Sequence, residues 1–122
     1  MARILLVDDN APLRAAMALG LARGGHSIQT AEDGAAGLRA LAAEVFDVVV
    51  TDLLMPERDG LELIKEAHAL QPQLRIIAIS GGGRLRPDAY LPTAKLFGAR
   101  RVLMKPFELD ELMHAIADVL AS

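Results

Sequence analysis

Four apolar runs of the sequence each end on polar side chains that can take part in chemistry. These side chains are Asp8 and Asp9, Asp52, Ser80 and Lys105. Three carboxylates that share one crevice repel one another, and a single lysine cannot neutralise them, so a hard divalent cation such as Mg²⁺ is their natural counter-ion. A metal ion beside a carboxylate, a lysine and a hydroxyl suits phosphoryl transfer, in which we expect Asp52 to be the nucleophile and the cations to stabilise the developing charge.

The run that leads to Asp52 carries the clearest strand signal. Residues 48–50 are three valines, apolar on both faces, which is typical of a central strand in a parallel sheet covered by helices on both sides. A carboxylate at the end of such a strand is costly to bury unless it lies in a cleft with counter-charges. Pro56 and Gly60 then break the chain, so we expect Asp52 at the mouth of a strand-to-helix turn.

The rest of the chain alternates short apolar runs with helical periodicity. Strands are expected at 3–7, 27–31, 48–52, 74–79 and 100–104. Helices are expected from Asn10 to Gly24, from Asp33 through Leu38 and Leu41 to Val45, from Asp59 to Pro72, from Pro87 to Gly98, and from Glu108 to Leu120. This alternation predicts an α/β fold, a doubly wound five-stranded parallel sheet with five helices on its two faces.

The character of each strand predicts the strand order. The first, third and fourth runs are continuously apolar and therefore central, whereas the second alternates and the fifth opens with arginines, so these two are the expected edges. That fits the order 2-1-3-4-5, in which the first and third strands flank the topological switch point. Ligands of open α/β sheets bind there, beyond the carboxyl ends of the strands, where the polar side chains are expected.

Length and composition bound the kind of protein. A chain of 122 residues is expected to form a single domain, 1–122. Hydrophobic residues make up 52% and the mean hydropathy is +0.30, which fits a core covered on two faces, and no apolar run approaches the roughly 18 residues of a membrane span. The formal charge of -3 argues against a dedicated nucleic-acid binder, and no cysteine is present for a disulfide or a thiolate metal site. Because no signal-peptide pattern opens the chain, we expect a cytoplasmic location.

The polar residues and their neighbours, taken together, resemble the signature of a known family. The matching residues are Asp8-Asp9, Asp52 with Met55-Pro56 and Gly60, Ser80, and Lys105-Pro106-Phe107. They are similar to those of response-regulator receiver domains of two-component signalling, and the match covers essentially the whole chain. The resemblance implies a flavodoxin-like (CheY-like) fold and a cis peptide bond before Pro106.

The resemblance also implies a role for each carboxylate. Asp52 would accept a phosphoryl group from a histidine kinase or a histidine phosphotransfer protein. Asp9, Asp52 and the main-chain carbonyl of Leu54 would bind Mg²⁺, with Asp8 helping through water. Such a domain would be a phosphorylation-controlled switch and not an enzyme with a separate substrate.

The resemblance also implies that Ser80 hydrogen-bonds the phosphoryl group and that Lys105 pairs with the negative charge of that group. Two features depart from the family. Receivers commonly carry an aromatic residue three positions before this lysine, where the present sequence has Val102. The segment 81–87 contains extra residues relative to the family. Tyr90 is our candidate for a residue that takes over part of the role of the missing aromatic residue, which reports the phosphoryl state in receivers.

The resemblance places the output on the surface of the fourth helix, fifth strand and fifth helix. The sequence ends at Ser122, soon after the last expected helix. We therefore expect a stand-alone receiver whose output passes through a downstream protein partner, a homodimer or a domain outside this sequence. No direct contact with nucleic acid or membrane is expected.

Two alternatives from other classes stay open. A phosphorylation-independent receiver-like interaction module would keep the core, and Val102 counts mildly for it, while the intact set of Asp9, Asp52, Ser80 and Lys105 counts against it. An aspartyl-phosphate hydrolase of small phosphoesters generally has its nucleophile on the first strand in an Asp-x-Asp pattern, whereas here the first strand ends Asp-Asp. Gly81 to Gly83 lack the Lys-Ser/Thr ending of a phosphate-binding P-loop, so they are interpreted as loop.

Overall fold

The computed structural model describes residues 2–52, 60–80 and 98–121. In chain order the elements are β1 (Arg3–Val7), α1 (Ala11–Arg23), β2 (Ser27–Ala31), α2 (Gly34–Ala43), β3 (Val48–Asp52), α3 (Gly60–Leu70), β4 (Arg75–Ser80), β5 (Ala99–Met104) and α5 (Leu109–Ala121). The helix expected from Pro87 to Gly98 lies, except for Gly98, outside the described residues.

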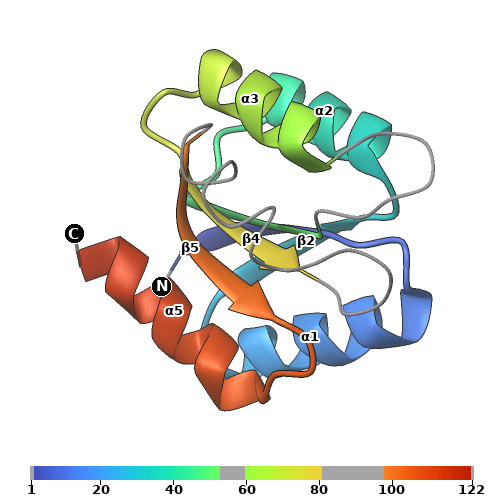
Figure 1. Cartoon of the computed structure of the whole chain (residues 1–122), viewed down its shortest axis with the longest axis vertical. Helices are drawn as coiled ribbons and strands as arrows, with labels where there is room; N and C mark the ends of the chain where they lie inside the picture. The colour runs from blue at the N-terminus through green and yellow to red at the C-terminus, as the bar shows by residue number, and fades with distance from the viewer. Residues whose placement is uncertain (1, 53–59, 81–97, 122) are drawn as a thin grey trace.

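The strands form one parallel sheet in the predicted order, β2-β1-β3-β4-β5. Figure 1 shows α2 and α3 on one face of the sheet and α1 and α5 on the other. The prediction of a doubly wound α/β fold is therefore confirmed, as are the polar second strand and the arginine-rich fifth strand at the two edges. β1 and β3 are paired with each other, and each has a further strand on its other side. Their carboxyl ends therefore lie side by side at the switch point.

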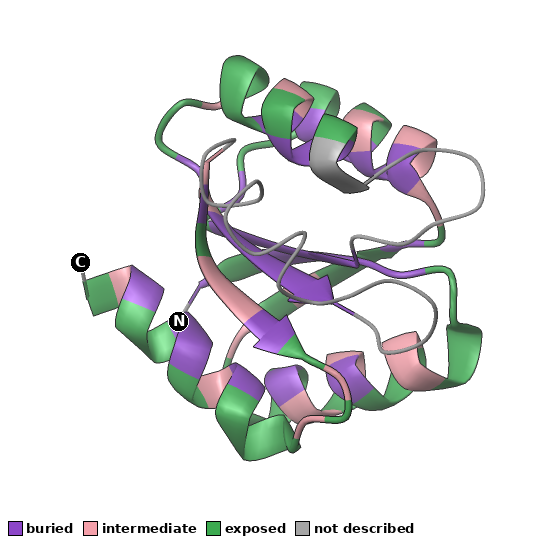
Figure 2. Ribbon diagram, viewed as in Figure 1, coloured by how far each residue is buried: buried purple, intermediate pink, exposed green. Residues whose placement is uncertain are grey.

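Apolar residues on both faces of the central strands build two cores. Leu5, Val7 and Val49 pack under α2 and α3. Ile4, Leu6 and Val50 pack against α1 and α5 on the opposite face. All five residues of β3 are buried, which confirms the interpretation of the valine run as a central strand. Figure 2 shows the same division, with buried residues on the strands and exposed residues on the outer faces of the helices.

The limits of α1 follow from residues that the sequence singled out. The Asn10 side chain accepts a hydrogen bond from the Leu13 amide at 3.1 Å and caps the helix, and proline occupies the first turn. Gly25 ends the segment with φ +93, a conformation that residues with a Cβ rarely adopt. The predicted start and stop of this helix are confirmed.

The predicted end of α2 is wrong at Val45. The helix stops at Ala43, and Val45 is 78% exposed instead of lying on the apolar face. The cause is Gln71, which follows α3: its side-chain amide donates to the carbonyls of Leu41 and Glu44, each at 2.8 Å. These bonds satisfy carbonyls at the end of α2, so the chain turns toward β3 one residue before Val45.

Among the described residues, no helix is both long enough and apolar enough to cross a membrane.

Candidate functional site

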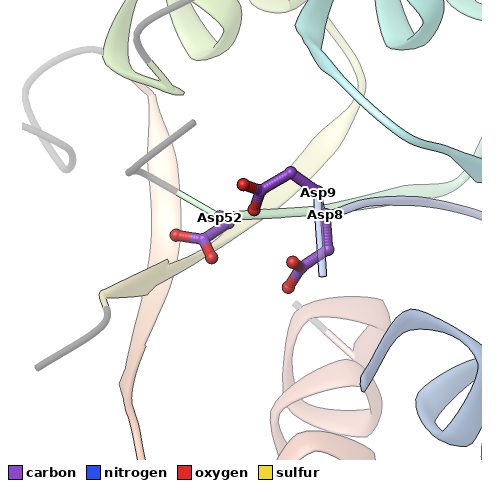
Figure 3. Close-up of side chains that lie close together, drawn as sticks. All are labelled: Asp8, Asp9 and Asp52. Atoms are coloured by element: carbon purple, nitrogen blue, oxygen red, sulfur yellow. The ribbon is translucent and has the colours of Figure 1, made fainter. Parts of the chain in front are cut away.

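Three carboxylates meet at the carboxyl ends of β1 and β3. Asp8 and Asp9 directly follow β1, and Asp52 is the last residue of β3. One oxygen from each lies within 4.8 Å of the others, and Figure 3 shows the three side chains together at the strand ends. Asp8 and Asp52 are buried, 0% and 3% exposed, while Asp9 is exposed. The predicted convergence of the acidic residues is confirmed.

Lys105 joins this cluster from the end of β5. Its Nζ donates to Asp52 Oδ2 at 2.8 Å and lies 3.7 Å from Asp8 Oδ2. A hydrogen bond between an ammonium group and a carboxylate is stronger than one between neutral groups. A single lysine still offsets the charge of one carboxylate out of three, so the cluster keeps an excess of negative charge.

The charges in the site shift the pKa values of two groups. Burial raises the pKa of the Asp8 carboxyl above its ordinary value, although the Asn10 amide and the Lys105 charge act in the opposite sense. Burial alone would lower the pKa of Lys105, but its hydrogen bond to Asp52 and the charge of that carboxylate outweigh burial, so the Lys105 pKa is raised. Lys105 is therefore a cation throughout the physiological pH range.

The donor set suits a hard divalent cation. Asp8 Oδ1 accepts a hydrogen bond from the Asn10 amide at 2.8 Å, but Asp8 Oδ2 is buried and has no hydrogen-bond partner. A buried carboxylate oxygen without a partner is costly, and a metal ion would satisfy it. Because Asp9 is exposed, the cluster is open to water. This suits Mg²⁺, which usually keeps several water ligands. The acidic cluster can thus hold Mg²⁺.

Ser80 lies at the same end of the sheet as these groups. It is the last residue of β4, 4% exposed, and its carbonyl accepts a hydrogen bond from the Lys105 amide at 2.8 Å. In the parallel register Asp52 faces Ile79, so Ser80 lies one residue beyond it. The structure therefore brings Ser80 beside the strand ends that carry Asp52 and Lys105, while the role of its hydroxyl stays a prediction.

The segment after Lys105 has the backbone that the resemblance implied. The Lys105–Pro106 peptide bond is cis, as predicted. Phe107 is half-buried and packs against the core on the α1 and α5 face. Val102, at the position that is commonly aromatic, is half-buried against the core under α2 and α3. Leu54, with its expected carbonyl ligand, and Tyr90 lie outside the described residues.

Two polar residues near the site were missed by sequence reasoning. The Thr51 hydroxyl is buried and donates to the main-chain oxygen of Asp52 at 3.1 Å. Arg14 Nη1 donates to the main-chain oxygen of Asp8 at 2.6 Å. A hydroxyl inside an otherwise apolar strand and a cation near the start of a helix were the available signals.

An acidic cluster with a paired lysine at the switch point of a 2-1-3-4-5 sheet defines the class of a receiver-type signalling domain. The family model described as "Response regulator receiver domain" matches residues 4–117. The chain belongs to this family, and it is a receiver domain of two-component signalling.

Similar proteins differ in how much of them the chain spans. Over 119 residues the chain is 41% identical to the transcriptional regulatory protein GlrR of Escherichia coli K12, and the match covers 98% of the chain but 26% of GlrR. The response regulator receiver protein CpdR of Brucella abortus is 34% identical, with 98% of both chains covered. A solved receiver domain protein (CheY-like) from Methanospirillum hungatei JF-1 has a TM-score of 0.92 at 27% identity, covering 99% of this chain and 94% of that one.

Proposed function

We propose that Asp52 is the phosphoryl acceptor of this receiver domain and that Asp8, Asp9 and Asp52 hold Mg²⁺, with the Leu54 carbonyl as a further ligand. The observation that carries the proposal is the contact of buried Asp52 with the ammonium group of Lys105, in a cluster with the two carboxylates that follow β1. This arrangement sets the Asp52 side chain against positive charge and beside the groups that would hold Mg²⁺, which suits a carboxylate nucleophile.

The chemistry is a single displacement at phosphorus. An oxygen of the Asp52 carboxylate attacks the phosphorus of a phosphohistidine, a phosphorus–oxygen bond forms, and the phosphorus–nitrogen bond breaks with its electron pair returning to the imidazole. When bound, Mg²⁺ supplies positive charge for the phosphoryl oxygens. Lys105 then exchanges its contact with Asp52 for one with the phosphoryl group, and Ser80 donates its hydroxyl to another phosphoryl oxygen.

The domain's own chemistry ends with hydrolysis of this acyl phosphate. Water attacks the phosphorus, the bond to Asp52 breaks, and the carboxylate is restored. We infer that the domain has no separate substrate, since the family is one of signalling domains. Its output is a difference in partner affinity between the two states, which is what a switch must have.

The histidine donor is proposed to approach over a groove beside Lys105. Leu13 of α1 and Lys105, Pro106 and Phe107 line this groove, which has a volume of about 440 Å³. Its walls are mostly apolar, so they suit the side of a helix that presents a phosphohistidine. The downstream partner, or a second copy of the chain, is proposed to bind at β5, α5 and the segment 81–97.

The test is intact mass after incubation with acetyl phosphate, with and without Mg²⁺. We expect the wild type to gain one phosphoryl group only when Mg²⁺ is present, and Asp52→Asn to gain none because the nucleophilic oxygen is removed. Asp110→Asn, which changes an exposed carboxylate in the first turn of α5, is the matched control and should react like the wild type.

Failure of the wild type to gain a phosphoryl group would favour the second candidate, a phosphorylation-independent interaction module. The observation that favours this module is Val102. This half-buried valine occupies the position where receivers commonly carry an aromatic residue. Absence of both a phosphoryl adduct and beryllofluoride binding by the wild type would contradict the phosphoacceptor proposal, because beryllofluoride mimics the adduct without its hydrolysis.

A further inference from the structure

Arg14 of α1 makes a hydrogen bond to the backbone of the acidic cluster. Its Nη1 donates to the carbonyl oxygen of Asp8 at 2.6 Å, and that carbonyl belongs to the peptide unit joining Asp8 to Asp9. The Arg14 side chain is half-buried. It is therefore held against the turn between β1 and α1 and does not extend freely into water.

The other contacts of this turn hold Asp8 in place. The direction of the Asp9 side chain depends instead on the orientation of the Asp8–Asp9 peptide. The Asp8 amide donates to the Ala31 carbonyl at 3.2 Å, and its carboxylate accepts from the Asn10 amide at 2.8 Å. Asp9 is exposed, so packing does not hold its side chain. Repulsion from the carboxylates of Asp8 and Asp52 favours rotation of Asp9 toward water. The hydrogen bond from Arg14 opposes this by fixing the peptide from which Asp9 projects.

The position of Arg14 is electrostatically unusual. The residue lies in the first turns of α1, where the helix dipole disfavours a cation. It also lies close to a cluster that has to attract a divalent cation, which a nearby positive charge repels. The carboxylates of the cluster attract the guanidinium in general, but they do not explain why it is bonded to the backbone carbonyl of Asp8 and not to one of the carboxylates.

We propose that Arg14 is a positioning residue that orients the Asp8–Asp9 peptide so that the Asp9 carboxylate faces the Mg²⁺ site. This inference rests on the proposed function, because it requires that the acidic cluster binds the metal. It predicts an effect opposite in sign to simple charge repulsion: removal of the arginine weakens Mg²⁺ binding, although a repelling charge has been removed.

The experiment is calorimetric titration of the unphosphorylated protein with Mg²⁺. Arg14→Met keeps the length of the apolar stem but removes both the charge and the donor, and we expect its Mg²⁺ dissociation constant to rise about tenfold, the scale for loss of a group that orients a metal ligand. Arg14→Lys retains a charge and a donor and should recover most of the loss. Arg23→Met, in the last turn of the same helix, is the matched control and should bind like the wild type.

The outcomes separate this inference from the proposed function. Wild-type protein that does not bind Mg²⁺ would contradict the metal site itself. Wild-type binding with equal or tighter binding by Arg14→Met would overturn the role of Arg14 alone, as would an equal loss in Arg14→Met and Arg23→Met. Folding of each variant is checked by urea unfolding, and Arg14→Ala, which also removes the charge and the donor and suits a helix, takes the place of Arg14→Met if that variant does not fold.

Discussion

Ionisation of Asp8 lowers the stability of the folded protein. Its carboxyl is buried, one oxygen has no hydrogen-bond partner, and burial raises its pKa above the ordinary value of 3.8. A carboxyl whose pKa is higher in the folded than in the unfolded state binds its proton more tightly when folded. Its contribution to stability is therefore lost as the pH rises through the folded-state pKa, and at neutral pH the charged group destabilises the fold.

Replacing Asp8 by asparagine should stabilise the protein in the absence of divalent cations. We expect Asp8→Asn to raise the free energy of unfolding at pH 7 by about 1–3 kcal/mol, the scale for desolvation of a buried polar group, because the isosteric amide carries no charge. The difference from the wild type should shrink as the pH falls and Asp8 becomes protonated. Urea unfolding in the presence of a chelator at several pH values measures both effects.

The same variant should lose part of the stabilisation that Mg²⁺ gives to the wild type. A ligand at one hundred times its dissociation constant adds about 2.7 kcal/mol to stability, and this gain falls with the affinity. Asp110→Asn, at an exposed position, serves again as the control. Lower stability of Asp8→Asn than of the wild type at neutral pH without metal would contradict the argument.

Lys105 has the opposite relation to pH. Its pKa is raised above the ordinary 10.5 through the pairing with Asp52, so its ion pair is fully present below the unfolded-state pKa and is lost only as the pH rises through the folded-state value. The acid-side and neutral behaviour of the site is therefore determined by the carboxylates, and Lys105 remains a fixed positive charge.

At the scale of elements, one side chain connects the ends of α2 and α3. Gln71 donates to two carbonyls at the end of α2, and its Oε1 accepts from the Phe46 amide at 3.3 Å. Those bonds end the helix and direct Phe46 into the core. The connection lies near the start of β3, at the end of the sheet opposite Asp52.

Removal of this connection should destabilise the fold without altering the site. We expect Gln71→Ala to lower the free energy of unfolding by about 1–2 kcal/mol, because three backbone groups lose their partner and water replaces it only in part. Gln73→Ala, two residues later and exposed, should have little effect. Urea unfolding measures the loss, and an unchanged yield of phosphoryl adduct would show that the site is independent of it. Equal stability of the two variants would contradict a capping role.

At the scale of the whole molecule, the groove beside Lys105 combines α1 with the segment after β5, which are far apart in the sequence. The double variant Leu13→Ala, Phe107→Ala removes apolar surface from both sides of this groove. Transfer from a histidine-phosphorylated protein donor should slow about tenfold, the scale for truncating central interface residues. Reaction with acetyl phosphate should be unchanged, because a small donor does not need the groove.

The comparison of the two donors separates docking from chemistry. Leu70→Ala, which truncates a half-exposed leucine at the end of α3, is the control for loss of an exposed apolar side chain. An equal slowing with both donors would place the effect of the double variant in the site itself and would contradict docking in the groove.

Local patterns in the sequence were enough to predict the sheet and the meeting of its polar ends. The apolar runs identify the central strands because burial on both faces demands apolar residues at every position. The parallel arrangement then brings Asp8, Asp9, Asp52 and Lys105 together with no further information.

Contacts between distant residues could not be predicted in the same way. The end of α2 depends on Gln71, which follows a different helix, so the local pattern carried the helix too far, to Val45. The hydrogen bond of Arg14 depends on the path of the turn after β1, and a charged residue on a helix is otherwise indistinguishable from a solvated one. The cis bond before Pro106 was predicted only through the resemblance to receivers.

The position of β3 in the sheet determines which part of the molecule can respond to a modification of Asp52. β3 is buried along its whole length and hydrogen-bonded to β1 on one side and β4 on the other, so its amide hydrogens exchange with solvent only when most of the domain opens. Among the described strands, β5 is paired only with β4, and this pairing has an irregularity between Ile76 and Ile77. Asp52, the proposed acceptor, thus ends a strand that is paired on both sides, whereas Lys105 follows an edge strand. We therefore expect a new charge on Asp52 to displace β5 and to leave β3 in place, and comparison of amide hydrogen exchange in the two strands before and after modification measures this.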